Sequence, residues 1–320
     1  MQILKKIISL TVIITSSFFL LNAADINVGY LTGTRCIPVA ALIERASYPE
    51  LNFFSFQDSS SLINQFNEET VDVGFLPVME AYDAYLKSDG KIIMCAITQN
   101  GNAAVVSRKK IKSINNLENC YIMIPRKIAG TSENYIFDYL SHEIFVFSNI
   151  ENSEEIIISK LISGSVSYAL LCEPYISLAK KRSADFMSYE ISKDYTHNAI
   201  RPNYPVMVMV VRREFASKNP EILASFIKQY RKAFEWTYAN RDKVYQLIEK
   251  YGFQVSKSEL DGTNIIDTFT SIPTVHEGNV TVAKDITGNF FKACLVVNPT
   301  FFGGKIPNDD FYYGTSFKNN

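Results

Sequence analysis

Residues 26–45 read INVGYLTGTRCIPVAALIER and set a pattern that much of the chain repeats. The run 26–31 has the β-branched and aromatic residues that strands favour. A short polar turn, Gly33-Thr34-Arg35, follows this run, and residues 38–45 then have the spacing of a helix. A strand, a polar turn and a helix in this order predict one βα unit of a largely parallel sheet.

The same alternation continues through the first hundred residues, with strands at 51–56 and 71–76 and helices at 60–67 and 78–87, and then restarts. A fourth strand-like run at 92–97 leads into the polar segment 98–102 and another short run at 103–107, where we expect a boundary between two lobes. Beyond it, strands at 120–124, 144–147 and 167–172 and helices near 131–140 and 153–162 predict a second α/β lobe.

A second crossing is predicted at 201–205, where two prolines favour extended backbone before the apolar strand 206–211. Helical patterns at 220–240, 241–250 and 281–294 are then expected to pack on the first lobe. The predicted division is a signal peptide at 1–23, the first part of lobe one at 24–105, lobe two at 106–203, and the rest of lobe one with the C-terminal helices at 204–320.

The N-terminal segment has the three parts of a secretory signal peptide. Lys5 and Lys6 are basic, residues 7–21 are apolar, and small residues follow at 23–24. A retained anchor is the alternative, but the apolar run is shorter than the roughly twenty residues of a spanning helix. The first cysteine, Cys36, lies too far on for a bacterial lipid anchor. We therefore expect a periplasmic or extracellular protein.

Composition excludes several classes of function. The 320 residues are 47% apolar, enough for two lobes, and the formal charge of −1 becomes −3 when Lys5 and Lys6 are subtracted. A nucleic-acid partner is therefore not expected. The five cysteines are scattered and odd in number, and the three histidines lack ligand spacing, so neither a disulfide framework nor a metal or other cofactor is expected.

Candidate binding residues lie at the predicted carboxyl ends of strands, where open α/β sheets bind their ligands. These ends are short, polar and mostly uncharged, which favours binding over acid–base catalysis. No G-x-S-x-G elbow, P-loop or H-E-x-x-H motif is present, so we expect no enzyme. The candidate residues are Gly33, Thr34, Arg35, Met79, Asn100, Asn102, Thr131, Ser132 and Glu173.

Simpler roles are open for several of these residues. Thr131 or Ser132 could cap the following helix, and Glu173 could serve as a helix-start residue favoured by the helix dipole. Arg35 could be a solvated surface charge.

Five segments resemble the solute-binding proteins of ABC importers for nitrate, sulfonates, taurine and thiamine-precursor pyrimidines. The resemblance spans most of the chain after the leader. It implies a two-lobe type II periplasmic-binding fold, with a mixed sheet flanked by helices in each lobe, two hinge crossings and a permease in the membrane as partner. The segments are residues 26–31, 69–77, 114–124, 164–174 and 215–221.

The resemblance is to proteins that capture a small molecule by hinge closure, and we expect a monomer. Helix starts at Thr131 and near Pro38, with Arg35 nearby, favour an organic anion, whereas the many aromatic residues favour a heterocycle, and both stay open. By position in the motifs the resemblance assigns ligand contact to Gly33, Thr34, Met79, Asn100, Thr131 and Glu173. The alternative is an enzyme of thiamine-precursor or menaquinone synthesis on the same fold. The scattered cysteines and the leader argue against these enzymes. A sensor would bind its ligand in the same way.

Overall fold

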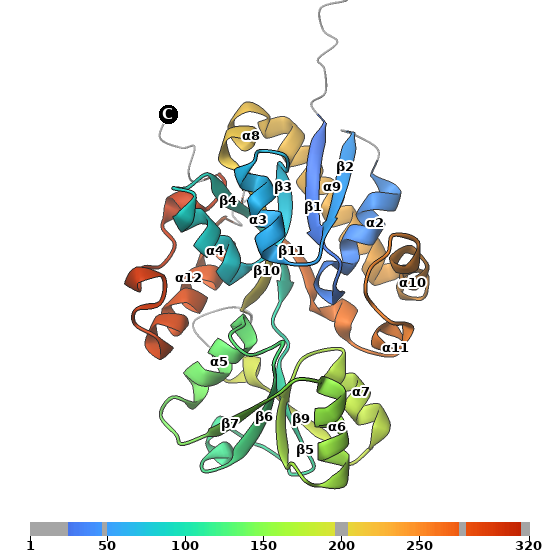
Figure 1. Cartoon of the computed structure of the whole chain (residues 1–320), viewed down its shortest axis with the longest axis vertical. Coiled ribbons are helices and arrows are strands. Elements are labelled where there is room, and N and C mark those ends of the chain that lie inside the picture. Colours follow the sequence, from blue (N-terminus) through green and yellow to red (C-terminus); the bar gives the residue numbers. More distant parts are fainter. Residues whose placement is uncertain (1–24, 47–49, 196–203, 275–279, 315–320) are drawn as a thin grey trace, which may run out of the picture.

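The computed structural model describes residues 25–46, 50–195, 204–274 and 280–314. Within these residues the chain forms two bodies, each around its own sheet (Figure 1). The predicted signal peptide lies outside the described residues, as do residues 201–203 of the predicted second crossing. In the part of the chain that is described, no helix has the length and apolar character needed to cross a membrane.

The described residues of the first body form a six-stranded sheet, two strands of which come from late in the sequence. The first three strands are parallel, and β10 lies antiparallel between β3 and β4. Seven of the eight residues of β10 are buried, which explains its continuous apolar sequence. In spatial order the strands are β11 (Phe269–Pro273), β4 (Ile92–Asn100), β10 (Pro205–Arg212), β3 (Val73–Pro77), β1 (Ile26–Leu31) and β2 (Leu51–Phe56).

Helices cover both faces of this sheet. In α9, buried Phe226, Tyr230, Ala233 and Thr237 recur at helical spacing, so this face packs on α2 while the opposite face meets water. On the other face, α4 contacts β3, β4 and β10, and α12 contacts β10 and β11. The bounds are α2 (Ile37–Arg45), α3 (Ser59–Asn67), α4 (Val78–Lys87), α8 (Arg213–Lys218), α9 (Pro220–Ala239), α10 (Arg241–Lys250), α11 (Lys257–Leu260) and α12 (Val280–Val297).

The second body is a five-stranded mixed sheet, as far as the chain is described. β6 pairs in parallel with β7 and β8, and β5 pairs antiparallel with β8 and β9. The strands in spatial order are β7 (Phe147–Glu151), β6 (Tyr121–Pro125), β8 (Tyr168–Leu171), β5 (Ala104–Ser107) and β9 (Met187–Glu190), and the helices are α5 (Ser132–Ser141), α6 (Glu154–Ser163) and α7 (Tyr175–Arg182).

Some predicted element bounds were wrong. The strand predicted at 144–147 lies instead at Phe147–Glu151; it is an exposed edge strand, so no buried face gave it an apolar pattern. β4 continues to Asn100, because the polar residues Thr98 and Gln99 are buried inside the strand. β4 ends at Asn100 in the first sheet and β5 begins at Ala104 in the second, so the connection between the sheets lies at residues 101–103, just before the predicted boundary at 105/106.

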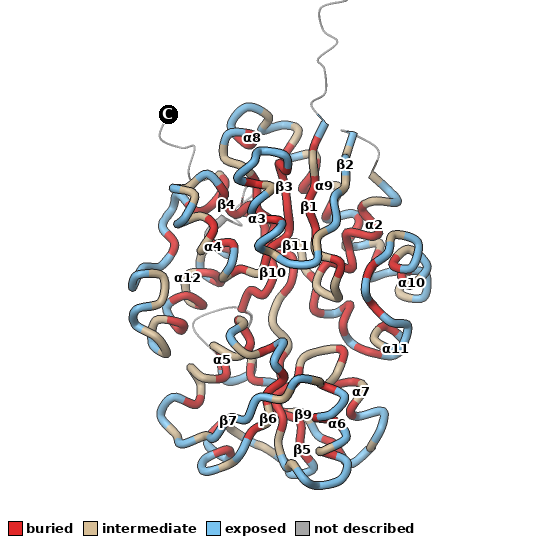
Figure 2. The backbone as a smooth tube through the Cα atoms, viewed as in Figure 1, coloured by how far each residue is buried: buried red, intermediate tan, exposed pale blue. Residues whose placement is uncertain are grey.

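Apolar packing joins the two bodies along one flank, where α5 lies against α12. Tyr135 of α5 stacks on Phe301 with ring centroids 5.0 Å apart, and Tyr195 packs edge-on against Tyr204 at 5.9 Å. Buried residues concentrate along the strands of each body, with exposed residues outside (Figure 2). One continuous apolar cluster therefore includes the first body and the α5 side of the second, while α6 and α7 cover a smaller, separate core.

Asp138 of α5 makes stability depend on pH. Burial raises its pKa from the ordinary 3.8 to about 6, so the folded state holds a proton that the unfolded chain has already lost between these pH values. Stability from this group is present below about pH 4 and is lost as the pH rises towards 6. We expect Asp138→Asn to raise the free energy of unfolding by about 1–2 kcal/mol at pH 7.5 and by almost nothing at pH 4. The value at pH 7.5 is reduced to account for the partial exposure of the side chain.

Urea unfolding of both proteins at the two pH values measures this difference. The substituted amide can still accept the hydrogen bond from Asn134 Nδ2, which is 2.9 Å long in the native protein. An equal gain at both pH values would show that ionisation of Asp138 is not the cause.

Candidate ligand-binding cleft

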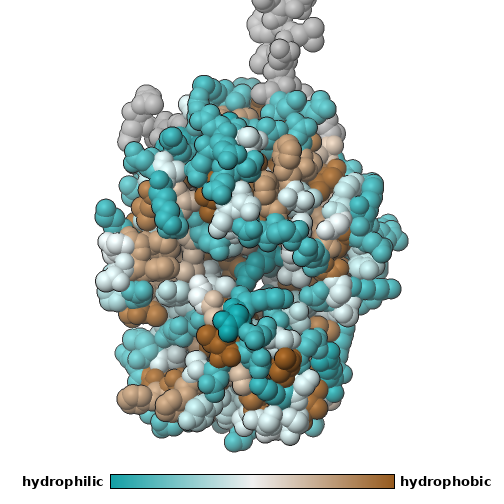
Figure 3. All heavy atoms as spheres, viewed as in Figure 1, coloured by the Kyte–Doolittle hydropathy of each residue, from teal (hydrophilic) through white to brown (hydrophobic). Residues whose placement is uncertain are grey.

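Two adjoining cavities lie between the bodies and share Arg35 and Lys127. The first, about 340 Å³, is called the polar cavity; it lies among the ends of β1, β4 and β8 and the start of α7. The second, about 430 Å³, is called the apolar cavity; it lies among α4, the start of α5 and Phe301-Phe302. In the space-filling view the waist between the bodies is hollowed and bordered by hydrophilic side chains (Figure 3).

All nine residues predicted from the carboxyl ends of strands line these two cavities. Arg35 lines both, and the other eight line one each. Ligand contact by these residues stays a prediction. The polar cavity includes Gly33, Thr34, Arg35, Asn100, Asn102 and Glu173, and the apolar cavity includes Arg35, Met79, Thr131 and Ser132.

Arg35 is not a solvated surface charge. It belongs to a single 3-10 turn (Thr34–Cys36) after β1, and its Nη2 lies 3.0 Å from Glu133 Oε1 on α5. The pair therefore joins the first body to the second. The Glu133 side chain is only 4% exposed and that of Arg35 29%, so the carboxylate depends on the guanidinium for its partner.

Glu133 was missed by the reasoning from sequence, although it directly follows the predicted Thr131 and Ser132. A signal was present, since a carboxylate in the first turn of a helix is favoured by the helix dipole. Oε1 meets Arg35 and lies 3.9 Å from Cys172 Sγ, whereas Oε2 is buried and has no hydrogen-bond partner among the described residues. Burial is the main cause that raises the pKa of Cys172, and the nearby carboxylates raise it further. The thiol therefore stays protonated.

The end of β4 presents an amide whose orientation is fixed. Gln99 Nε2 donates a hydrogen bond to Thr268 Oγ1 at 2.8 Å. The Thr268 hydroxyl in turn donates to Ile265 O at 2.7 Å. Thr268 can therefore only accept from Gln99, which makes Oε1 the free atom of the amide. This oxygen and Asn100 Oδ1 are buried and have no hydrogen-bond partner in the described part of the chain.

Thr131 and Glu173 both lie at helix starts of the second body, but only the Glu173 side chain accepts hydrogen bonds from its helix. Thr131 occupies the N-cap position of α5, but its hydroxyl donates backwards to Ile128 O at 2.7 Å and caps nothing. Glu173 does act at a helix start, because its carboxylate accepts from the backbone N and the hydroxyl of Ser177 in α7. Burial raises the pKa of Glu173.

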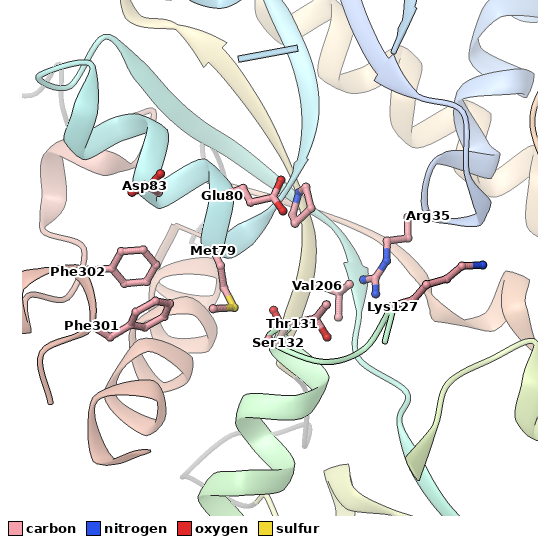
Figure 4. A pocket seen from close by; sticks show the side chains of 12 residues that line it. Arg35, Met79, Glu80, Asp83, Lys127, Thr131, Ser132, Val206, Phe301 and Phe302 are labelled. Atoms are coloured by element: carbon pink, nitrogen blue, oxygen red, sulfur yellow. The ribbon is translucent and has the colours of Figure 1, made fainter. Parts of the chain in front are cut away.

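The apolar cavity combines a thioether with two aromatic rings. Met79 of α4 lies between Phe301 and the Thr131-Ser132 turn, with Arg35 and Lys127 on the far side (Figure 4). The rings of Phe301 and Phe302 are 3.9 Å apart at their centroids. Such a wall suits a ring or another flat apolar group.

The described residues contain no cluster suited to a metal ion and no disulfide. Within the described ranges no three His, Cys, Asp or Glu side chains gather as a metal site would need. Each of the five cysteines, all in the described part of the chain, is free. The absence of a cofactor stays a prediction.

No protein-family model and no curated protein matches this sequence. Solved structures are similar in fold. An ABC transporter protein from Parabacteroides distasonis has a TM-score of 0.70 at 16% identity, over 90% of this chain and 98% of the other. The periplasmic aliphatic sulphonate binding protein SsuA from Escherichia coli has a TM-score of 0.63 at 12% identity, over 90% of both chains.

A third similar structure is the zinc-bound ligand-binding component of an ABC-type import system from Staphylococcus aureus, with a TM-score of 0.59 at 16% identity over 92% of this chain and 98% of the other. These likenesses confirm the predicted periplasmic-binding-protein fold, with two mixed sheets flanked by helices. At such low identity the likeness extends to the fold only, and the function is a separate question.

Proposed function

We propose that the protein binds a small molecule in the cleft between its two bodies, outside the cytoplasm, and delivers it to the permease of an ABC importer. The observation that carries this proposal is the placement of the cavities. Polar strand ends from both sheets meet at one cleft, and Asn102 of the first connection between the sheets lines it. The described residues of both bodies present polar groups to this cleft, which supports capture by closure.

The cleft has different kinds of contact on its two flanks. Along the α7–α11 flank the contacts between bodies are polar: Tyr175 donates to Glu259 Oε1 at 3.3 Å, and the Asn264 backbone N donates to Ser177 Oγ at 3.3 Å. Water can replace such bonds at little net cost, whereas separating the aromatic rings on the α5–α12 flank exposes apolar surface. Opening is therefore proposed at the α7–α11 flank, with the pivot near α12.

A ligand drives this closure only through contacts that it makes better in the closed form. Shifting the ratio of closed to open from 1:99 to 99:1 takes about 5.5 kcal/mol of differential affinity. A few hydrogen bonds from the second body, at about 0.5–1.5 kcal/mol each, together with burial of an apolar group, supply this amount.

The test combines a thermal-shift screen with small-angle X-ray scattering on the purified protein. The screen covers taurine, an alkanesulfonate, nitrate, an aminopyrimidine and a flavin, since saturation at a hundred times Kd stabilises by about 2.7 kcal/mol. A compound that binds should also reduce the radius of gyration. A tight ligand that leaves the radius unchanged would contradict closure, and a screen without any binding would contradict capture of these solutes.

A further inference from the structure

We propose that the cleft selects a cationic ligand, with a nitrogen head group that donates hydrogen bonds in the polar cavity and an apolar ring that enters the apolar cavity. This inference rests on the proposed function and names the class of ligand. Both an organic anion and a heterocycle are compatible with the sequence. The charges of the cleft favour a positively charged ring compound that contains nitrogen.

Carboxylates outnumber bases around the cleft. Of the described residues that line the two cavities, two are basic and six are acidic, so the formal charge is 2 − 6 = −4. A field of this sign raises the local concentration of cations and disfavours anions. The bases are Arg35 and Lys127, and the acids are Glu80, Asp83, Glu133, Glu154, Glu173 and Glu259.

Each of the two basic side chains has a carboxylate nearby. Arg35 lies 3.0 Å from Glu133, and Lys127 Nζ lies 3.9 Å from Glu154 Oε2. An anionic head group at Arg35 would lie beside the Glu133 carboxylate, so like-charge repulsion offsets much of the attraction of the guanidinium. A cationic head group is instead attracted by that carboxylate.

The polar groups left over in the wall are acceptors. Gln99 Oε1, Asn100 Oδ1 and Glu133 Oε2 are buried oxygens without a hydrogen-bond partner among the described residues, and all three residues line the polar cavity. The hydrogen bonds of Thr268 fix the free atom of Gln99 as an acceptor. A buried acceptor left unpaired costs about 1–3 kcal/mol, so a ligand with N–H donors is the complement that this wall lacks.

The apolar cavity lies next to these acceptors and suits the apolar ring of the proposed ligand. It shares Arg35 and Lys127 with the polar cavity, so one molecule can reach both. Met79, Phe301 and Phe302 present soft apolar surface, and aromatic faces attract a neighbouring positive charge.

The test uses probes that share a benzene ring and differ in the charge of the head group: benzamidine, benzoate and benzenesulfonate. Titration calorimetry at low and moderate salt measures their affinities. We expect benzamidine to bind at least tenfold more tightly than either anion. Glu133→Gln should weaken benzamidine at least tenfold and, because it frees Arg35, strengthen benzoate, which reverses the preference.

Two further variants separate local from general effects. Glu143→Gln removes the same charge from an exposed position beside α5 and should leave all three affinities unchanged. Gln99→Met removes the buried acceptor at similar size and should weaken benzamidine even if Glu133→Gln does not fold.

A native preference for benzoate or benzenesulfonate would overturn the cationic class and leave the proposed capture role standing, since a ligand would have been bound. Failure of all three probes would also overturn the inference. The capture role is then decided separately by the scattering measurement with the broader screen.

Discussion

Replacing Gly101 with alanine is expected to lower the free energy of unfolding by about 3 kcal/mol or more, because the added methyl group has no space. A Cβ at this position would lie 1.8 Å from Cε2 and 2.0 Å from Cζ of Tyr204. Tyr204 is fully buried, and its hydroxyl accepts a hydrogen bond from Ala103 N, so the ring cannot move aside easily. Gly101 N also donates to Tyr204 O at 2.8 Å, which ties the first crossing to the start of β10.

Thermal and urea unfolding measure the effect, which should lower Tm by about 5 °C or more. Gly33→Ala is the matched control, since no atom would lie within 4 Å of its Cβ and its φ of −92° suits any residue. An unfolding free energy for Gly101→Ala within about 0.5 kcal/mol of the native protein would mean that Gly101 and Tyr204 are not packed together as described.

The sequence predicted the parts of the fold that have a strong local pattern. The helices 78–87 and 241–250 match the structure at both ends, because each has a clear apolar stripe and good helix formers. β9 and β11 were not predicted. Both are short edge strands whose pairing is decided by distant partners, β5 and β4, rather than by their own residues.

The candidate cleft was predicted residue by residue only where a rule of topology applied. Strand ends converge, so Thr34, Asn100 and Glu173 could be named without coordinates. The first-turn position of Glu133 could be seen in the sequence, but its ion pair could not, because the partner is an arginine about a hundred positions earlier in the chain. The sign of the charge around the cleft could not be predicted for the same reason. Arg35 alone suggests a site for an anion, but in the structure the Glu133 carboxylate lies beside its guanidinium.

Replacing Arg35 with methionine should destabilise the described arrangement of the two bodies, the proposed closed form, by about 3 kcal/mol, since it leaves the Glu133 carboxylate buried without its partner. Methionine keeps the apolar stem, so the loss reports the charge rather than the packing. The carboxylate can regain water if the bodies separate. We therefore expect both a lower Tm and a larger radius of gyration in the absence of ligand.

The double variant Arg35→Met/Glu133→Gln distinguishes a lost attraction from a stranded charge. With both charges gone, no ion remains buried, and replacing a buried ion pair by neutral groups is often nearly neutral for stability. The double variant should therefore regain most of the Tm and the compact radius, with a residual loss of about 1 kcal/mol or less. If the double variant is as unstable and as open as Arg35→Met alone, burial of Glu133 is not what couples the two bodies, and the closed form must depend instead on the α5–α12 packing.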